Sequence, residues 1–148
     1  MRGLVLALLL SPVLACGYVP QDLWAKTWKY ARAWGVDPYL VAAVVWVESG
    51  YCPGAVGRAG EVGLGQFMPG TWARTTGAPV EWRAHPDWAL WATAKHLREL
   101  YFAVGGDWRK ALWAYNAGLG AVQRGRVPAS TLRYAEKVLA VYRAWRRG

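Results

Sequence analysis

One carboxylate stands out as a candidate catalytic group, because the residues on its two sides differ sharply in character. Glu48 follows an unbroken apolar run, residues 39–47 with the sequence YLVAAVVWV, and precedes Ser49 and Gly50. Apolar neighbours desolvate a carboxyl and disfavour its charged form, so we expect a raised pKa for Glu48. An acid that is still protonated near neutral pH suits proton donation to a leaving oxygen. The alternative is a solvent-facing residue on a last helical turn.

The element that must position this acid is a helix over residues 38–49. Asp37 is suited to cap it, Pro38 to occupy its first position, and Gly50 lies where it should end. A helix that is apolar on every side is normally buried. The helix therefore delivers Glu48 to the edge of the core.

A glycine-rich segment follows, with seven glycines between Gly50 and Gly70. This composition disfavours helix and strand interiors but suits a backbone that turns tightly and approaches a ligand. Its one carboxylate, Glu61, has two readings: an exposed loop residue or a second catalytic carboxylate. Hydrolysis by a pair of carboxylates would require Glu61 or Asp87 to lie across a cleft from Glu48, with room for a water molecule.

The remaining pattern predicts an all-α protein, because no long stretch alternates with period two. Helices are expected over residues 21–34, 38–49, 69–76, 86–102, 108–116 and 130–146. Apolar residues make up 55% of the chain, which is enough for one folded domain over residues 16–148.

The first 15 residues have the pattern of a signal peptide. An apolar stretch over residues 3–10 follows a short positive start, and small residues at 13–15 form a cleavage site before Cys16. The stretch is too short to span a bilayer as a helix. We therefore expect the mature chain to be exported to the periplasm or cell envelope.

The two cysteines, Cys16 and Cys52, allow two interpretations. The sequence VLAC at residues 13–16 resembles a lipobox, and acylation of Cys16 would anchor the chain to a membrane. Alternatively the cysteines form a disulfide, which an exported protein can keep. The disulfide is preferred, because antiparallel packing of the first two predicted helices would bring the two residues together.

Charge and histidine spacing exclude several classes of function. The chain has 18 Lys and Arg against 9 Asp and Glu, a net charge of +9, which indicates an anionic partner. Nucleic acid is not favoured, because no RNA or DNA motif accompanies the charge. His85 and His96 have no partners at ligand spacing, so we expect no metal and no cofactor. We expect a monomer.

Three segments together resemble the soluble lytic transglycosylase (SLT) domain, a member of the lysozyme-like superfamily. They are the Glu-Ser pair that ends the apolar helix, the segment GLGQFMP at residues 63–69, where the family usually has GLMQ followed by a proline, and AYNAG at residues 114–118. A later tyrosine, Tyr134, also matches. The match extends from about Trp24 to Tyr142.

The resemblance implies an enzyme, a glycan lyase acting on peptidoglycan (murein). It would cut the β-1,4 bond between N-acetylmuramic acid and N-acetylglucosamine and leave a 1,6-anhydro sugar. Glu48 would serve first as acid and then as base. Two alternatives are a lysozyme-type hydrolase of the same bond and a noncatalytic peptidoglycan-binding module, which would tolerate glutamine at position 48.

The resemblance also implies a set of substrate-binding residues. They are Ser49, Gln66, Met68, Tyr115, Asn116 and Tyr134. The two amides suit an N-acetyl group or a sugar hydroxyl, and Tyr134 is expected to hydrogen-bond Glu48. Tryptophans near the loop are candidates for a glycan platform, namely Trp72, Trp82 and Trp88.

The sequence departs from the family at two places. Position 57 is glycine where the family often has serine, nine residues after the catalytic Glu. Some members carry a Glu shortly before the matching tyrosine, where this chain has Ser130 and Thr131.

Overall fold

Helix α4 (Pro38–Ser49) lies at the centre of the fold, as its apolar sequence predicts. Asp37 caps its start, since the Oδ1 atom accepts a hydrogen bond from the Tyr39 backbone N–H at 2.9 Å. Gly50 ends it in the left-handed conformation, with φ of 62°. Residues 40–45 are all buried and form the middle of the main core.

The computed structural model describes residues 16–148, so the signal peptide predicted for residues 1–15 lies outside the described residues. Besides α4, the elements are α3 (Gln21–Ala33), α5 (Pro69–Thr76), the 3-10 helix η1 (Val80–Ala84), α6 (Pro86–Ala103), α7 (Trp108–Ala117), α8 (Leu119–Gln123) and α9 (Ala129–Arg147). The all-α prediction is confirmed, and all six expected helices are present to within a residue at each end. The short elements η1 and α8 were not predicted.

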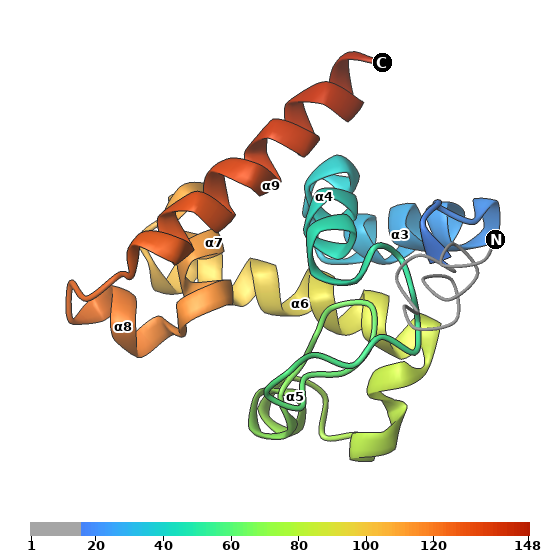
Figure 1. The fold of residues 1–148 in the computed structure, drawn as a ribbon, viewed down its shortest axis with the longest axis horizontal. Helices are drawn as coiled ribbons and strands as arrows, with labels where there is room; N and C mark the ends of the chain where they lie inside the picture. The colour runs from blue at the N-terminus through green and yellow to red at the C-terminus, as the bar shows by residue number, and fades with distance from the viewer. Residues whose placement is uncertain (1–15) are drawn as a thin grey trace, which may run out of the picture.

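Helix α4 is surrounded by α3, α6 and α9 (Figure 1). Within residues 16–148, none of the helices is long and apolar enough to cross a membrane. Helix α5 packs on α6, and α7 packs on α6 and α9, so these helices contribute to smaller cores beside the main one.

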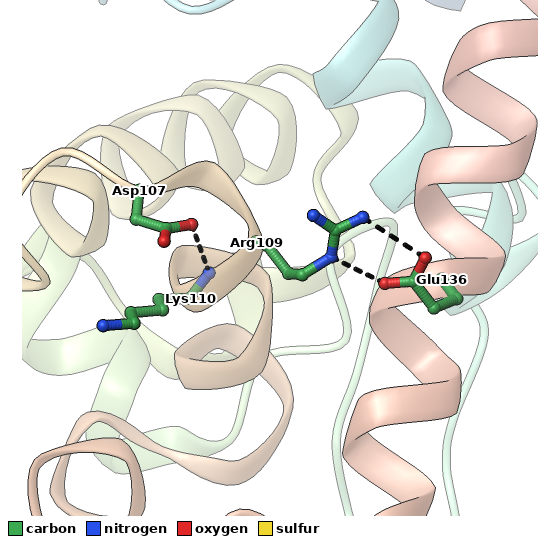
Figure 2. Close-up of polar contacts among 4 residues, drawn as sticks. All are labelled: Asp107, Arg109, Lys110 and Glu136. Carbon is green, nitrogen blue, oxygen red and sulfur yellow. Dashed lines mark hydrogen bonds and ion pairs between the residues drawn. The ribbon is translucent and has the colours of Figure 1, made fainter.

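Helices α7 and α9 are joined by an ion pair, which Figure 2 shows. Arg109 on α7 contacts Glu136 on α9 through two hydrogen bonds of 2.7 and 3.3 Å. Asp107 caps the start of α7 by accepting from the Lys110 backbone N–H at 3.1 Å. This pair links α7 at the protein surface to the part of α9 that carries Tyr134.

The glycine-rich segment runs between α4 and α5 without forming a sheet. Two isolated bridges, Val56 with Val62 and Val62 with Phe67, fold it back on itself. Ser49 ties it to the helix, because its buried hydroxyl lies 2.8 Å from the Leu64 carbonyl and 3.0 Å from that of Val45. The loop is thereby held beside the end of α4.

The segment before α3 is linked to the same loop. Cys16 and Cys52 form a disulfide, with a Cα–Cα distance of 5.2 Å. This distance lies inside the range that a disulfide requires. The link joins the beginning of the described chain to the loop just beyond Glu48.

Candidate active site

Glu48 lies on the last turn of α4 as a half-buried side chain. Its Oε2 atom accepts a hydrogen bond of 2.7 Å from the hydroxyl of Tyr134, on α9. Burial raises the pKa of Glu48 from 4.5 to about 7; the hydrogen bond from Tyr134 opposes the rise, and the charge of Glu61 adds to it. The group can therefore hold or release a proton near neutral pH.

Glu48 opens into a cavity of about 430 Å³. Glu61 and Gln66 from the loop line it, together with Met68, which is 43% exposed, and with Tyr115 and Asn116 from the end of α7. Thus five residues singled out in the sequence gather around the acid. A cavity with a carboxyl that titrates near neutral pH, together with amide and hydroxyl groups, is chemically suited to a sugar.

Gln66 is held in a strained conformation by its own loop. Its φ is 53°, in the left-handed region that residues with a side chain seldom adopt. The Nε2 group donates to the carbonyls of Ala55 at 3.1 Å and Gly63 at 2.9 Å. Both amide hydrogens are therefore used inside the protein, and the side-chain carbonyl is the part left to accept from a ligand.

Tyr115 closes the cavity wall against the loop. Its hydroxyl donates to the Gly65 carbonyl at 2.7 Å. A Cβ at Gly65 would lie 2.9 Å from that hydroxyl, 2.7 Å from the Phe67 ring and still closer to the Thr93 hydroxyl. This crowding favours glycine at position 65, where the family's GLMQ has methionine.

Asn116 is oriented from α9. The Thr131 hydroxyl donates to its Oδ1 atom at 2.7 Å, so the amide hydrogens of Asn116 are directed away from that contact. Thr131 occupies the region where some family members have a Glu. In this chain a buried threonine positions the amide instead.

Two predicted residues lie elsewhere. Ser49 does not line the cavity, because its buried hydroxyl is bonded to backbone carbonyls. Asp87 faces a separate cavity with Tyr30, whose hydroxyl donates to it at 2.7 Å, and pairs with Lys26 at 3.2 Å. Asp87 is therefore not a partner for Glu48 across the cavity. The sequence could not predict this, because the contact depends on how α3 and α6 pack.

The expected tryptophan platform is not formed at this cavity. Trp72 is fully buried and packs in a small core with Phe67 and Ala92. Trp82 is 41% exposed and contacts Trp88, but neither residue lines the cavity that contains Glu48. The prediction for Trp72 is wrong because its position on α5 faces inward.

Sequence reasoning missed part of the lining. Thr71 and Arg74 of α5 and His96 of α6 contribute to the cavity. Burial, and then the charges of Arg74 and Lys95, lower the pKa of His96 to about 4, so this histidine is neutral at physiological pH. The spacing of Thr71 and Arg74, one helical turn apart, was the available signal. Among the described residues, no group of three His, Cys, Asp or Glu side chains could hold a metal ion.

A model of the transglycosylase SLT domain family matches residues 26–136, about three quarters of the chain. The chain belongs to this family. The peptidoglycan transglycosylase gp16 of Escherichia phage T7 is 36% identical over 115 residues, covering 75% of this chain and 9% of that protein. An endo-type membrane-bound lytic murein transglycosylase A of Klebsiella pneumoniae is 43% identical over 58 residues, covering 39% of this chain and 29% of that protein.

A solved SLT structure has the same fold. The 70 kDa soluble lytic transglycosylase of Escherichia coli matches with a TM-score of 0.72 and 25% identity, over 84% of this chain and 24% of that chain. This SLT chain thus spans less than a third of the length of each of these three relatives. The lysozyme-like fold predicted from the sequence is confirmed.

Proposed function

We propose that this chain is a peptidoglycan lytic transglycosylase that cleaves the bond between N-acetylmuramic acid and N-acetylglucosamine. The observation that carries the proposal is the state of Glu48: a half-buried acid with a pKa of about 7, oriented by Tyr134 and opening into a cavity with Gln66 and Asn116. The names of the relatives, which refer to peptidoglycan or murein, agree with this substrate.

In the proposed reaction Glu48 acts twice, first as an acid and then as a base. Protonated Glu48 gives its proton to the glycosidic oxygen as the bond from that oxygen to C1 of the muramic acid breaks. The cation left at C1 is stabilised by the neighbouring acetamido group. The Glu48 carboxylate then removes the proton from the C6 hydroxyl, whose oxygen bonds to C1 and closes the 1,6-anhydro ring. Glu48 ends the cycle protonated, and a pKa near 7 suits both steps.

The other residues position the sugar. The Gln66 carbonyl oxygen and the Asn116 amide hydrogens are the polar groups left for hydroxyl and acetamido groups. Met68 and Tyr115 provide apolar contact with sugar faces at the cavity wall. Tyr134 acts through Glu48, by holding one carboxyl oxygen while the other faces the bond to be cut.

A second candidate function is hydrolysis of the same bond, and the observation that favours it is the presence of Glu61 in the cavity. A base there would activate a water molecule, which would add to C1. Lytic cleavage is preferred because the Glu61 carboxylate accepts a hydrogen bond from the Ala59 backbone N–H at 2.8 Å, inside its own loop.

The test is to digest purified peptidoglycan with the chain and to weigh the released sugars by mass spectrometry. Anhydromuramic ends support the proposal, and reducing ends one water heavier indicate hydrolysis. Unchanged peptidoglycan that nevertheless retains the protein would indicate a binding module. Glu48→Gln is the matched control, and its products must disappear while binding persists.

The site of action that we propose is the cell envelope, where peptidoglycan lies. The pairing of Cys16 with Cys52 supports an exported chain with a disulfide over a lipid anchor on Cys16. Mass spectrometry of the mature protein decides between them, because acylation adds the mass of the acyl chains whereas a disulfide removes two hydrogens.

A further inference from the structure

The side chain of Glu61 fills the space that a side chain at position 57 would need. A Cβ built on Gly57 would lie 2.5 Å from the Cγ of Glu61 and still closer to its Cδ and Oε1 atoms. The Gly57 backbone does not have positive φ, so the conformation itself would accept a side chain. What forbids one is the Glu61 side chain, which lies across the glycine.

The loop fixes this arrangement at both ends. The Gly57 backbone N–H donates to the Glu61 carbonyl at 2.8 Å, and the Glu61 Oε1 atom accepts from the Ala59 N–H at 2.8 Å. The carboxylate is thus held by a turn of five residues, half-buried at the wall of the cavity that contains Glu48. A serine at position 57, as in similar chains, and this pose of Glu61 exclude each other.

The cavity wall therefore carries a second carboxylate besides Glu48. We propose that Glu61, seated over Gly57, is a positioning residue whose negative charge helps to keep Glu48 protonated, so that it sets the pH range of the acid step without contacting the bond that breaks. This inference rests on the proposed function for its effect on activity. Its effect on the proton affinity of Glu48 is independent of any reaction.

Four other titratable or charged side chains lie in this cavity or contact Glu48. They are Tyr134 of α9, Tyr115 of α7, His96 of α6 and Arg74 of α5. The two tyrosines are half-buried and have raised pKa values, mainly through loss of contact with water, so they stay neutral. His96 is also neutral, since burial lowers its pKa to about 4. Arg74 is exposed and its guanidinium is bonded to Thr71, so its charge is screened by water.

Within the described part of the chain, Glu61 is consequently the negative charge in the cavity wall that can be removed without touching Glu48 or its hydrogen bond. Burial is the largest cause of the raised pKa of Glu48, so most of the rise must survive when Glu61 is neutralised. A like charge across a wet cavity contributes about half a pH unit at low ionic strength. The contribution must fade as salt is added.

The experiment measures the pKa of Glu48 directly, by carbon-13 NMR of the side-chain carboxyls at low ionic strength. Glu48→Gln identifies its signal. We expect Glu61→Gln to lower the pKa of Glu48 by about half a unit at low salt and by much less at 1 M salt. Gly57→Ala must lower it in the same direction, because the new Cβ displaces the Glu61 carboxyl. Gly54→Ala, where nothing lies within 4 Å of the added Cβ, is the matched control.

The double variant completes the test. With Glu61→Gln in place, adding Gly57→Ala must cause no further change, because the charge that it displaces is already absent. In activity assays of Glu61→Gln, the alkaline limb of the pH profile must move to lower pH by the same half unit. At pH values above this limb the variant must therefore be about threefold less active than the wild type. An unchanged pKa for Glu48 in Glu61→Gln overturns the inference. Loss of activity at every pH with an unchanged pKa also overturns it, because Glu61 would then act as a base.

The two proposals fail in different ways. If the chain does not cut peptidoglycan, the NMR titration still decides whether Glu61 acts on Glu48. If the titration shows no coupling while anhydro sugars are released, only the role of Glu61 is lost.

Discussion

Replacement of Glu48 by glutamine should abolish cleavage and, in addition, stabilise the protein at neutral and alkaline pH. The native pKa of about 7 lies above the ordinary value of 4.5, so the folded protein binds this proton more tightly than the unfolded chain. The stability that the Glu48 carboxyl contributes is therefore fully present below pH 4.5 and is lost as the pH rises through 7. Glutamine does not titrate, so the variant avoids that loss.

The size of the effect follows from the pKa difference. A rise from 4.5 to about 7 corresponds to about 3 kcal/mol, and the partial exposure of the side chain reduces this to about 2 kcal/mol. For a chain of this length the gain corresponds to about 6 °C in Tm. Glutamine can still accept the hydrogen bond from Tyr134, so that contact does not offset the gain.

The assay is urea unfolding of both proteins at pH 4 and pH 8. We expect nearly equal stabilities at pH 4 and a more stable variant at pH 8. Glu136→Gln is the control, because it removes the same charge from an exposed site where Arg109 lowers the pKa of the carboxyl. Glu136→Gln must therefore lower the unfolding free energy at pH 8, whereas Glu48→Gln raises it. A stability difference for Glu48→Gln that is the same at both pH values would refute the reasoning.

Three further changes test the geometry around the acid. Tyr134→Phe removes the hydrogen bond that favours ionised Glu48, so the pKa of Glu48 should rise further. The value of kcat should also fall about tenfold, because the carboxyl loses its orientation. A pH profile of kcat measures both effects. Gly65→Ala should cost about 1–3 kcal/mol by crowding the Tyr115 hydroxyl, measured by urea unfolding against Gly54→Ala, which should be nearly neutral. Gln66→Glu should lower the unfolding free energy by about 2 kcal/mol near neutral pH, because a carboxylate cannot donate to the two loop carbonyls. The loss should shrink in acid, because the carboxyl then gains a proton. Equal losses at pH 4 and pH 8 would contradict this.

The helices could be predicted because their signals are local. Asp37, Pro38 and Gly50 mark the ends of α4, and the apolar run between them leaves no face for solvent, so burial followed directly. The short helices η1 and α8 escaped prediction because five residues are too few for a periodic pattern to be read.

The interior of the loop could not be predicted, because its contacts are tertiary. The sequence identified Gln66 as polar and near a glycine turn, but only the folded loop shows that its amide hydrogens are spent on Ala55 and Gly63. Glu61 likewise reads as an exposed residue among glycines. Its place in the cavity wall requires that residue 57 has no side chain, and this relation between the two positions appears only in the folded loop.

The position of Glu48 at the end of α4 has a consequence beyond burial. The last turn of a helix carries a partial negative charge from its unpaired carbonyls, which disfavours a carboxylate at that end. Burial by the apolar helix and the charge of Glu61 act in the same direction, and only the hydrogen bond from Tyr134 acts against them. Burial and the helix end raise the pKa without any help from Glu61, so an acid at this place keeps a high pKa when the charge of the loop changes. The loop can therefore vary the operating pH through residues such as Gly57 and Glu61, without disturbing Glu48, the acid that we propose performs the reaction.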